Sequence, residues 1–404
     1  MCFKRISAIL DLGLTKYSFG VSCIVLVSLL CWYFNSSYIL EFIIEVPQAL
    51  APHDFLFNAI VIIALTFGLV FHTSLEKMGS LYLWAVGSFI GAILILLTPM
   101  KDLKLFFYYT MGVLFGLCQL SPFMYFWENS DIEKRGRIGG IITAIALIVF
   151  SLATAIGSFG LFNATIVSMT LNLMVLSTKV VLKTRSKSHQ KSRGYEHETR
   201  TVVAYLIPWI VFSVVNATLA RTITFSLMRF FQDSSFVMPL LQASGACLGA
   251  LSSGIMADLL GRKAAVAFGL TIYGIGLAVS GIVKSSIEAS LVFTLNGLSW
   301  GIFIVLFLLV IWGDLSSSKN LSRRYYLGLL TYYSSTLAGQ LLTSQITQVP
   351  LAAASLMSCA LVFLSNIPLL LASELLPSGF RRKAGLMLYL SFLRKKTRQT
   401  KECT

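Results

Sequence analysis

The sequence predicts an all-α membrane protein with twelve transmembrane helices, arranged as two pseudo-repeated six-helix halves. Three observations support this fold class. Apolar residues make up 56% of the 404 residues and charged residues only 12%, whereas soluble domains have roughly 45–50% and about 25%. The apolar residues gather into runs long enough to cross a bilayer. One long polar segment divides these runs near the middle of the chain.

Each predicted helix is an apolar run of about 20 residues, the length that a bilayer core about 30 Å thick requires. In the first half the runs cover 17–35, 55–74, 80–98, 104–127, 138–158 and 160–182. In the second half they cover 201–231, 236–257, 263–283, 289–313, 325–348 and 350–375. We therefore divide the chain into an N-terminal half (1–182), a linker (183–200), a C-terminal half (201–376) and a basic tail (377–404).

The basic residues are concentrated in alternate connections between the runs. If the N-terminus is cytoplasmic, 27 of the 32 Lys and Arg residues lie on the inner side. The outer connections contain only Lys101, Lys104 and Lys284, and Arg221 and Arg229 lie within the seventh span. The positive-inside rule then places both termini, the linker and the tail in the cytoplasm. We expect a multi-pass protein of the cell membrane, whose basic charge faces the lipid bilayer interface and does not bind nucleic acid.

An internal repeat agrees with two halves. Two glycines and a tryptophan of the fourth span recur in the tenth span, each displaced by 185 residues. The pairs are Gly112 and Gly297, Gly116 and Gly301, and Trp127 and Trp312. A constant offset between equivalent spans is what a duplicated six-helix unit leaves.

The connection after the eighth span reads GIMADLLGRK and contains Gly254, Asp258, Gly261, Arg262 and Lys263. Its glycines permit close helix contact and a sharp turn, and its carboxylate can stabilise the N-terminus of a neighbouring helix. The spacing resembles the signature cytoplasmic loop of the major facilitator superfamily, G-x-x-x-D-x-x-G-R-[RK]. That resemblance implies a gating role, because in the family this loop latches the two halves in one state. A plain positively charged turn is the alternative.

The resemblance also implies a partner for this loop and two weaker matches. The expected partner is the connection after the tenth span, which contains Asp314, Arg323 and Arg324. Further matches are Glu128 followed by Arg135 and Gly136, which is similar to an E-x(6)-R-G connection, and the run SELLPSGFRR that starts at Ser373. Both could be ordinary charged helix ends. The equivalent first-half segment, HTSLEKMGSL, has no arginine after Gly79, so we expect a weak or absent latch there.

The resemblance implies a monomeric secondary transporter that moves a small solute by alternating access, with the first, fourth, seventh and tenth helices around a central cavity. Buried polar groups are costly in lipid and usually face the bundle interior. The candidates for substrate binding are Gln119, Asn216, Arg221, Asn296 and Trp300. Arg221 would suit an anionic metabolite or amphiphile, or it could reach the outer interface. Asn216 and Arg221 differ by about 140° of helix rotation, so both cannot point into one cavity.

The eleventh span carries a polar stripe at spacings of three and four residues. It consists of Tyr333, Thr336, Gln340, Ser344 and Thr347. Such a stripe faces water or another helix, so we include Tyr333 and Gln340 among the candidates for substrate binding. For every candidate amide or hydroxyl, hydrogen bonding between helices is the alternative.

Other function classes lack their signatures. The seven cysteines form no CxxC pair, so we expect no metal site and no cofactor. The chain contains no H-E-x-x-H, G-x-S-x-G or P-loop pattern, so we do not expect an enzyme. All seventeen acidic residues fall in connections or near helix ends, which leaves no evident proton relay. A receptor, regulator or scaffold without transport activity is the alternative, since a fold does not fix a function.

Overall fold

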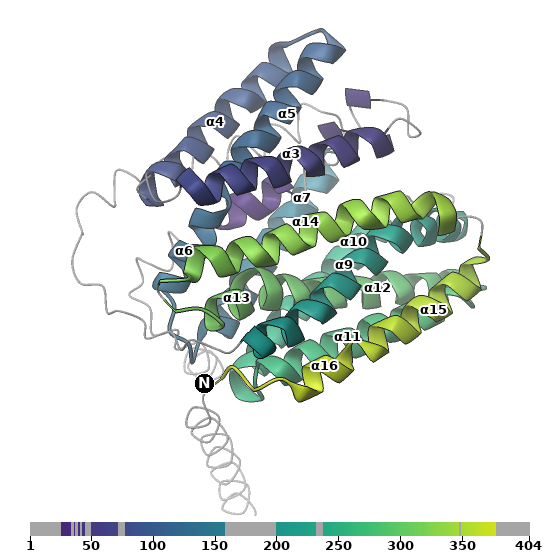
Figure 1. Cartoon of the computed structure of the whole chain (residues 1–404). Helices are drawn as coiled ribbons and strands as arrows, with labels where there is room; N and C mark the ends of the chain where they lie inside the picture. The colour runs from purple at the N-terminus through teal and green to yellow at the C-terminus, as the bar shows by residue number, and fades with distance from the viewer. Residues whose placement is uncertain are drawn as a thin grey trace, which may run out of the picture.

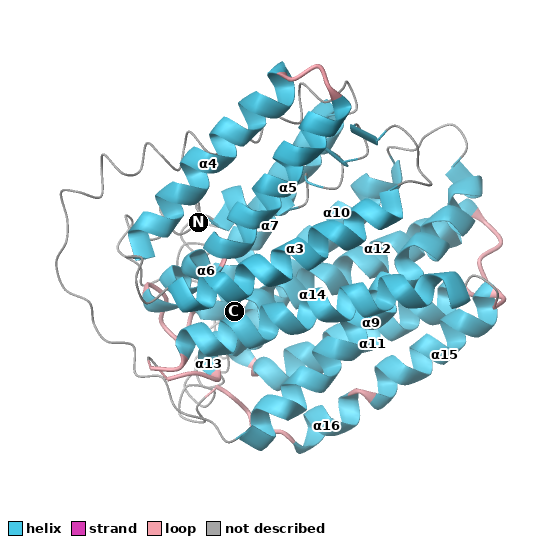
Figure 2. Cartoon of the chain, turned by 45° about the horizontal axis from the view of Figure 1, so that its top comes forward, coloured by secondary structure: helices cyan, strands magenta, loops and turns pink. Residues whose placement is uncertain are grey.

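The computed structural model describes residues 26–33, 36, 39–40, 43–44, 50–71, 77–157, 199–231, 237–317, 319–346 and 349–376 (Figure 1). Within these ranges every regular element is a helix, and Figure 2 shows the same bundle from a second direction. Seven of the helices in these ranges are long and apolar enough to cross a membrane, judged by length and composition. The prediction of an all-α, multi-pass membrane protein is confirmed at this level.

The helices before residue 158, here called the N-terminal group, follow the second to fifth predicted spans. They are α3 (Leu50–Phe71), α4 (Lys77–Leu97), α5 (Lys101–Cys118), α6 (Leu120–Glu128) and α7 (Arg135–Gly157). Residues 26–33, which are helical, belong to the predicted span 17–35 and extend this group toward the N-terminus. The rest of that span lies outside the described residues.

The helices after residue 198, here called the C-terminal group, follow the seventh to twelfth predicted spans. They are α9 (Thr199–Met228), η2 (Arg229–Phe231), α10 (Val237–Leu259), α11 (Arg262–Ser280), α12 (Ser286–Phe303), η3 (Ile304–Val310), α13 (Ile311–Asp314), α14 (Leu321–Ile346), α15 (Leu351–Leu364) and α16 (Asn366–Leu371). The predicted span 160–182, the linker up to residue 198 and the tail 377–404 lie outside the described residues. The number of twelve helices and the domain division therefore stay predictions.

Two of the long helices are interrupted next to the centre of the bundle. The fourth span breaks at Gln119, between α5 and α6. Pro122 explains the break, because proline has no N–H for the carbonyl of Cys118 and its ring crowds that carbonyl. The tenth span changes from α12 into the π-helix η3 and then into α13. Segments of π-helix are rare and are frequently found at functional sites.

The two groups meet along two pairs of helices. Helix α7 packs against α10, and α3 packs against α14, which Figures 1 and 2 both show side by side. The α7–α10 contact brings backbone against backbone: a Cβ on Gly254 would lie 2.5 Å from the carbonyl oxygen of Gly136. Small residues permit such an approach between membrane helices.

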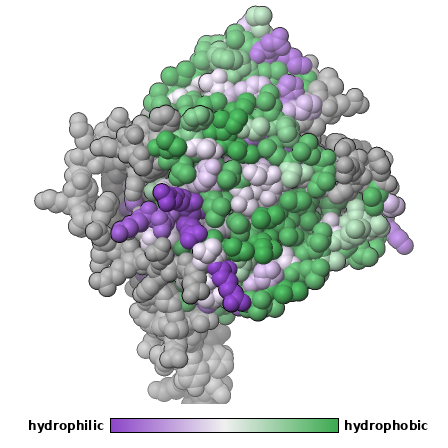
Figure 3. All heavy atoms as spheres, in the orientation of Figure 1, coloured by the Kyte–Doolittle hydropathy of each residue, from purple (hydrophilic) through white to green (hydrophobic). Residues whose placement is uncertain are grey.

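The outer faces of the helices are apolar. Exposed large side chains include Ile63 and Phe67 of α3 and Leu356 and Met357 of α15. Figure 3 shows green, hydrophobic residues over most of the visible helical surface, with purple, hydrophilic residues gathered toward its edges. A surface of this kind is stable against lipid and would be an aggregation hazard in water.

Candidate functional site

The first part of the site is a network of buried charges that joins the two groups. Asp258 lies in the last turn of α10 and is 4% exposed. Its carboxylate accepts hydrogen bonds from the backbone N–H groups of Gly136 (2.9 Å) and Arg137 (2.9 Å), in the first turn of α7. It also accepts one from Arg137 Nε at 3.1 Å. Asp258 therefore satisfies two unpaired donors at the start of a helix in the other group, where negative charge is stabilising.

Arg262 is the first residue of α11 and is fully buried. Its guanidinium binds Asp258 Oδ1 at 2.9 Å and Asp314 Oδ2 at 2.9 Å. A further nitrogen donates to the carbonyl oxygen of Ile132, in the connection before α7, at 2.6 Å. One side chain thus forms ion pairs with two aspartates of the C-terminal group and donates to a carbonyl of the N-terminal group.

Arg135 of α7 completes the network from the other side. It forms a short ion pair with Asp314 Oδ1 and donates to Ser130 Oγ at 3.0 Å and to the carbonyl oxygen of Ser130 at 2.9 Å. Its guanidinium lies 5.3 Å from the ring centre of Trp127. We call Arg135, Arg137, Asp258, Arg262 and Asp314 the charge network. Arg135, Asp258, Arg262 and Asp314 are buried, which is tolerable because each is paired with at least one opposite charge.

The loop between α10 and α11 is held by a third carboxylate. Gly261, at the N-cap of α11, has φ of 112°, a conformation that favours glycine. Glu374 accepts hydrogen bonds from the backbone N–H groups of Arg262 (2.8 Å) and Lys263 (3.2 Å), the first two residues of α11. Lys263 Nζ donates to the carbonyl oxygen of Ala372 at 3.1 Å. These contacts fix the backbone from which Arg262 enters the network.

The structure gives the predicted gating residues different surroundings. Asp258 and Arg262 belong to the charge network, as does Asp314 of the expected partner loop. Gly254, Gly261 and Lys263 lie beside these residues in α10, in the loop and in α11. Arg323 is exposed and Arg324 is half-buried, both in the first turn of α14. Neither side chain has an ion pair with another described residue. The gating role of all these residues stays a prediction.

Two arginines of the N-terminal group, Arg135 and Arg137, contact Asp314 and Asp258, and the sequence contains a signal for only one of them. Arg135 belongs to the connection that is similar to E-x(6)-R-G, whereas no pattern singles out Arg137. Their position opposite the aspartates depends on how α7 packs against α10, which no local motif records.

The second part of the site is a small cavity between the two groups, with a volume of about 20 Å³. Seven aromatic side chains line it: Tyr33, Phe115, Phe123, Trp209, Trp300, Tyr332 and Tyr333. The remaining lining residues are Gln119 and the aliphatic Leu29, Leu30, Ile304, Leu308 and Leu329. This volume holds about one water molecule, so the described helices enclose the centre tightly in this conformation.

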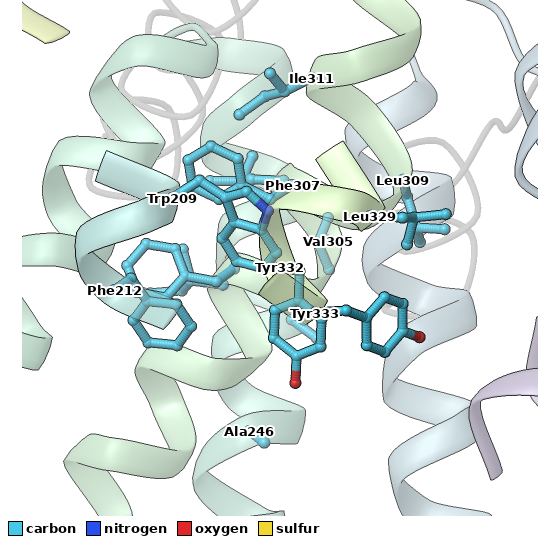
Figure 4. Close-up of a cluster of buried hydrophobic side chains, with 14 of the residues drawn as sticks. Trp209, Phe212, Ala246, Val305, Phe307, Leu309, Ile311, Leu329, Tyr332 and Tyr333 are labelled. Carbon is cyan, nitrogen blue, oxygen red and sulfur yellow. The ribbon is translucent and has the colours of Figure 1, made fainter. Parts of the chain in front are cut away.

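Two hydrogen bonds between side chains cross this cavity from one group to the other. The hydroxyls of Tyr33 and Tyr332 lie 2.7 Å apart, and the Tyr333 hydroxyl donates to Gln119 Oε1 at 3.0 Å. Figure 4 shows Tyr332 and Tyr333 beside the stacked rings of Trp209 and Phe307, with the two hydroxyls pointing in different directions.

Three predicted substrate-binding residues, Gln119, Trp300 and Tyr333, line this cavity. Asn216 and Asn296 instead line a second space of about 10 Å³ inside the C-terminal group. Asn216 accepts a hydrogen bond from Trp300 Nε1 at 3.0 Å, so it fixes the orientation of the indole that lines the central cavity. The binding roles of these residues stay predictions.

Of the remaining candidates, Gln340 lines neither space. Gln340 has a buried Oε1 without a partner among the described residues and does not line the central cavity. Arg221 belongs to α9, but its side chain lies outside what the structure describes. Tyr33, Trp209 and Tyr332 were not predicted, because an aromatic residue in a membrane helix looks the same in sequence whether it faces lipid or a cavity.

The fold is similar to that of a solved major facilitator superfamily protein, the human organic anion transporter MFSD10 (TETRAN). The TM-score is 0.66 at 12% sequence identity, and the match covers 88% of this chain and 99% of that chain. At this identity the likeness shows the fold alone. No family model matches the chain, and no curated protein sequence matches it.

Proposed function

We propose that this chain, which has the fold of the major facilitator superfamily transporters, is a secondary transporter that moves a small solute by alternating access. The observation that carries the proposal is the charge network. It joins the N-terminal group to the C-terminal group through charged side chains and backbone N–H donors, which water can solvate when the two groups separate. The proposed partners are the solute and the lipid bilayer. The chain would act as a monomer in the cell membrane, with both termini in the cytoplasm.

The residues of the charge network are divided between the two groups, so that the groups can separate with few broken ion pairs. Arg135 and Arg137 belong to the N-terminal group, and the other three residues belong to the C-terminal group. Parting α7 from α10 would break the bonds of Asp258 to Gly136 and Arg137, and the ion pair of Arg135 with Asp314. Arg262 would stay between both aspartates, since all three belong to the C-terminal group. Each separated side would keep internal partners, and water could satisfy the freed N–H groups at the start of α7. The closed form is therefore favoured without being irreversible.

The cavity lies between the same two groups and fits the same motion. Its two crossing hydrogen bonds, Tyr33–Tyr332 and Tyr333–Gln119, would part when the groups separate. Side chains that close the centre in one state would then be free to contact a solute in another. Closure around the solute and opening toward the other side would complete the cycle.

Uptake by the purified full chain in liposomes tests the proposal. We expect saturable uptake of at least one compound from a panel of neutral, anionic and cationic labelled solutes, above that of protein-free liposomes. We also expect Asp258→Asn to change the rate at least severalfold, and the exposed variant Lys319→Gln to leave it unchanged. Absence of uptake across the panel, with clear thermal stabilisation by one of its members, would instead identify a receptor without transport activity.

A further inference from the structure

The central cavity has an unusual chemistry for a site that handles polar metabolites. None of its thirteen lining residues, among the residues the structure describes, carries a charge. The nearest network of charges, around Arg262 and Asp314, does not line it. An anion or cation placed in the cavity would lose its hydration without gaining a described counter-charge, which is costly in a low-dielectric site.

Aromatic rings supply most of the lining, and they come from both groups. In the C-terminal group, Trp209 and Tyr332 stack with ring centres 5.4 Å apart and planes at 21°. In the N-terminal group, Tyr33 and Phe115 stack with centres 5.8 Å apart and planes at 16°. Between the pairs, the ring of Tyr33 meets those of Tyr332 and Tyr333 edge to face, with ring centres 6.4 Å apart in both cases. These contacts would part as the groups separate, which makes the outer ring surfaces of the tyrosines available to a ring-shaped ligand.

The polar side chains among the lining residues are neutral, and one of them has a buried atom without a partner among the described residues. Gln119 is 1% exposed, and its Oε1 accepts the hydrogen bond from Tyr333. Its Nε2 has no hydrogen-bond partner among the described residues. A buried amide N–H group without an acceptor is costly, and a ligand that brings an acceptor would remove that cost.

We propose that the cavity binds a neutral, ring-containing amphiphile whose carbonyl or similar acceptor receives a hydrogen bond from Gln119 Nε2. The rings of Trp209, Trp300 and Tyr332 would hold the apolar body, and the hydroxyls of Tyr332 and Tyr333, once parted from their partners by opening, would bind further neutral groups. This assignment of the substrate class rests on the proposed transporter function. It differs from the anionic substrate expected from Arg221, whose side chain lies outside the described residues.

Matched head groups on the same ring bodies test the assignment. The probes are the carboxamide, the carboxylate and the trimethylammonium-methyl derivatives of benzene, naphthalene and anthracene. Their affinity is measured by thermal stabilisation of the purified full chain. We expect at least one carboxamide to stabilise the wild-type chain, and to do so at lower concentration than its charged counterparts. A carboxylate or ammonium compound that binds more tightly than every carboxamide overturns the proposal, and so does a carboxamide series that does not bind.

Variants then test the role of Gln119. Gln119→Leu removes the donor and should weaken carboxamide binding about tenfold, the upper end for one neutral hydrogen bond. Asn366→Leu is the matched control, because its buried amide lies in α16, outside the cavity. If Gln119→Leu does not fold, Gln119→Glu serves in its place, since it replaces the N–H donor with an acceptor. Unchanged carboxamide affinity in a folded Gln119 variant overturns the assignment.

Uptake measurements separate a failure of this assignment from a failure of the proposed function. A carboxamide that binds but is not taken up into liposomes contradicts transport and leaves the ligand class intact. Uptake of a carboxylate or ammonium compound, without binding of any carboxamide, contradicts the ligand class and leaves transport intact.

Discussion

Asp258 links α10 to the start of α7 and is paired with Arg262, so its charge is compensated from both groups. Asp258→Asn keeps the shape of the side chain and removes the charge, which leaves Arg262 and Arg137 without part of their compensation. We expect a loss of about 3 kcal/mol in the free energy of unfolding, the scale for breaking a buried ion pair. Thermal or denaturant unfolding of the purified chain in detergent measures it.

Arg323→Gln is the control for that variant, because Arg323 is exposed and has no ion pair with another described residue. Its expected change is below about 0.5 kcal/mol. Equal effects of the two variants would show that Asp258 contributes no more than a surface charge.

Gly261 permits the turn between α10 and α11. In Gly261→Ala the residue would keep φ near 112°, and its Cβ would lie 2.6 Å from the Glu374 carboxyl carbon. We expect the variant to be destabilised by about 1–3 kcal/mol, the cost of holding a residue with a Cβ in a backbone region that is essentially restricted to glycine. Gly276→Ala is the matched comparison, since the nearest atom to its Cβ would be 3.4 Å away. A Gly261→Ala chain as stable as Gly276→Ala would contradict the strained turn.

At the residue level, the sequence indicated the loop and one of its partners, Asp314, but did not single out Arg137. The spacing of Gly254, Asp258, Gly261 and Arg262 indicated a turn with a carboxylate at a helix N-terminus, and the structure places Asp258 at the N-terminus of α7. The arginine-rich start of α14 gave a similar signal, yet Arg323 and Arg324 lie apart from the charge network. Charged residues at helix ends look alike in sequence, and packing between distant helices decides which of them meet.

Helices α7 and α10 form the closest contact between the two groups, and a native cysteine lies at it. Cys247 of α10 has its Sγ 3.8 Å from the carbonyl oxygen of Ala144 in α7. Ala144→Cys should therefore form a disulfide with Cys247 under mild oxidation, because the sulfur of Cys247 already reaches the backbone of residue 144. Mass spectrometry of proteolytic fragments identifies the cross-link. Ala144→Ser is the control, and a failure of Ala144→Cys to cross-link would contradict the α7–α10 contact.

At the level of elements, the predicted spans located the described helices. Of the two helix interruptions, the sequence explains only one. Pro122 is visible in the sequence and explains why the fourth span breaks at Gln119. The π-helix η3 has the sequence IVLFLLV, which contains neither proline nor glycine. Its geometry comes from packing inside the bundle, so the apolar run predicted only a helix.

At the level of the whole molecule, composition and the polar break predicted a membrane bundle, and the described helices agree with it. The lining of the cavity could not be predicted in the same way. Membrane helices are apolar on the faces toward lipid and on those toward the protein, so periodicity does not separate them. Polar Gln119 could be selected from sequence, whereas Trp209 and Tyr332 could be placed only with the fold.

If the two groups separate during each transport cycle, a reversible lock between them should stop transport, and this is the most direct test. Ala144→Cys is reconstituted in liposomes, and uptake of a transported solute is measured before oxidation, after oxidation and after reduction. We predict that uptake falls in proportion to the cross-linked fraction and returns on reduction, while Ala144→Ser does not respond. Undiminished uptake by fully cross-linked protein would contradict transport through separation of α7 from α10.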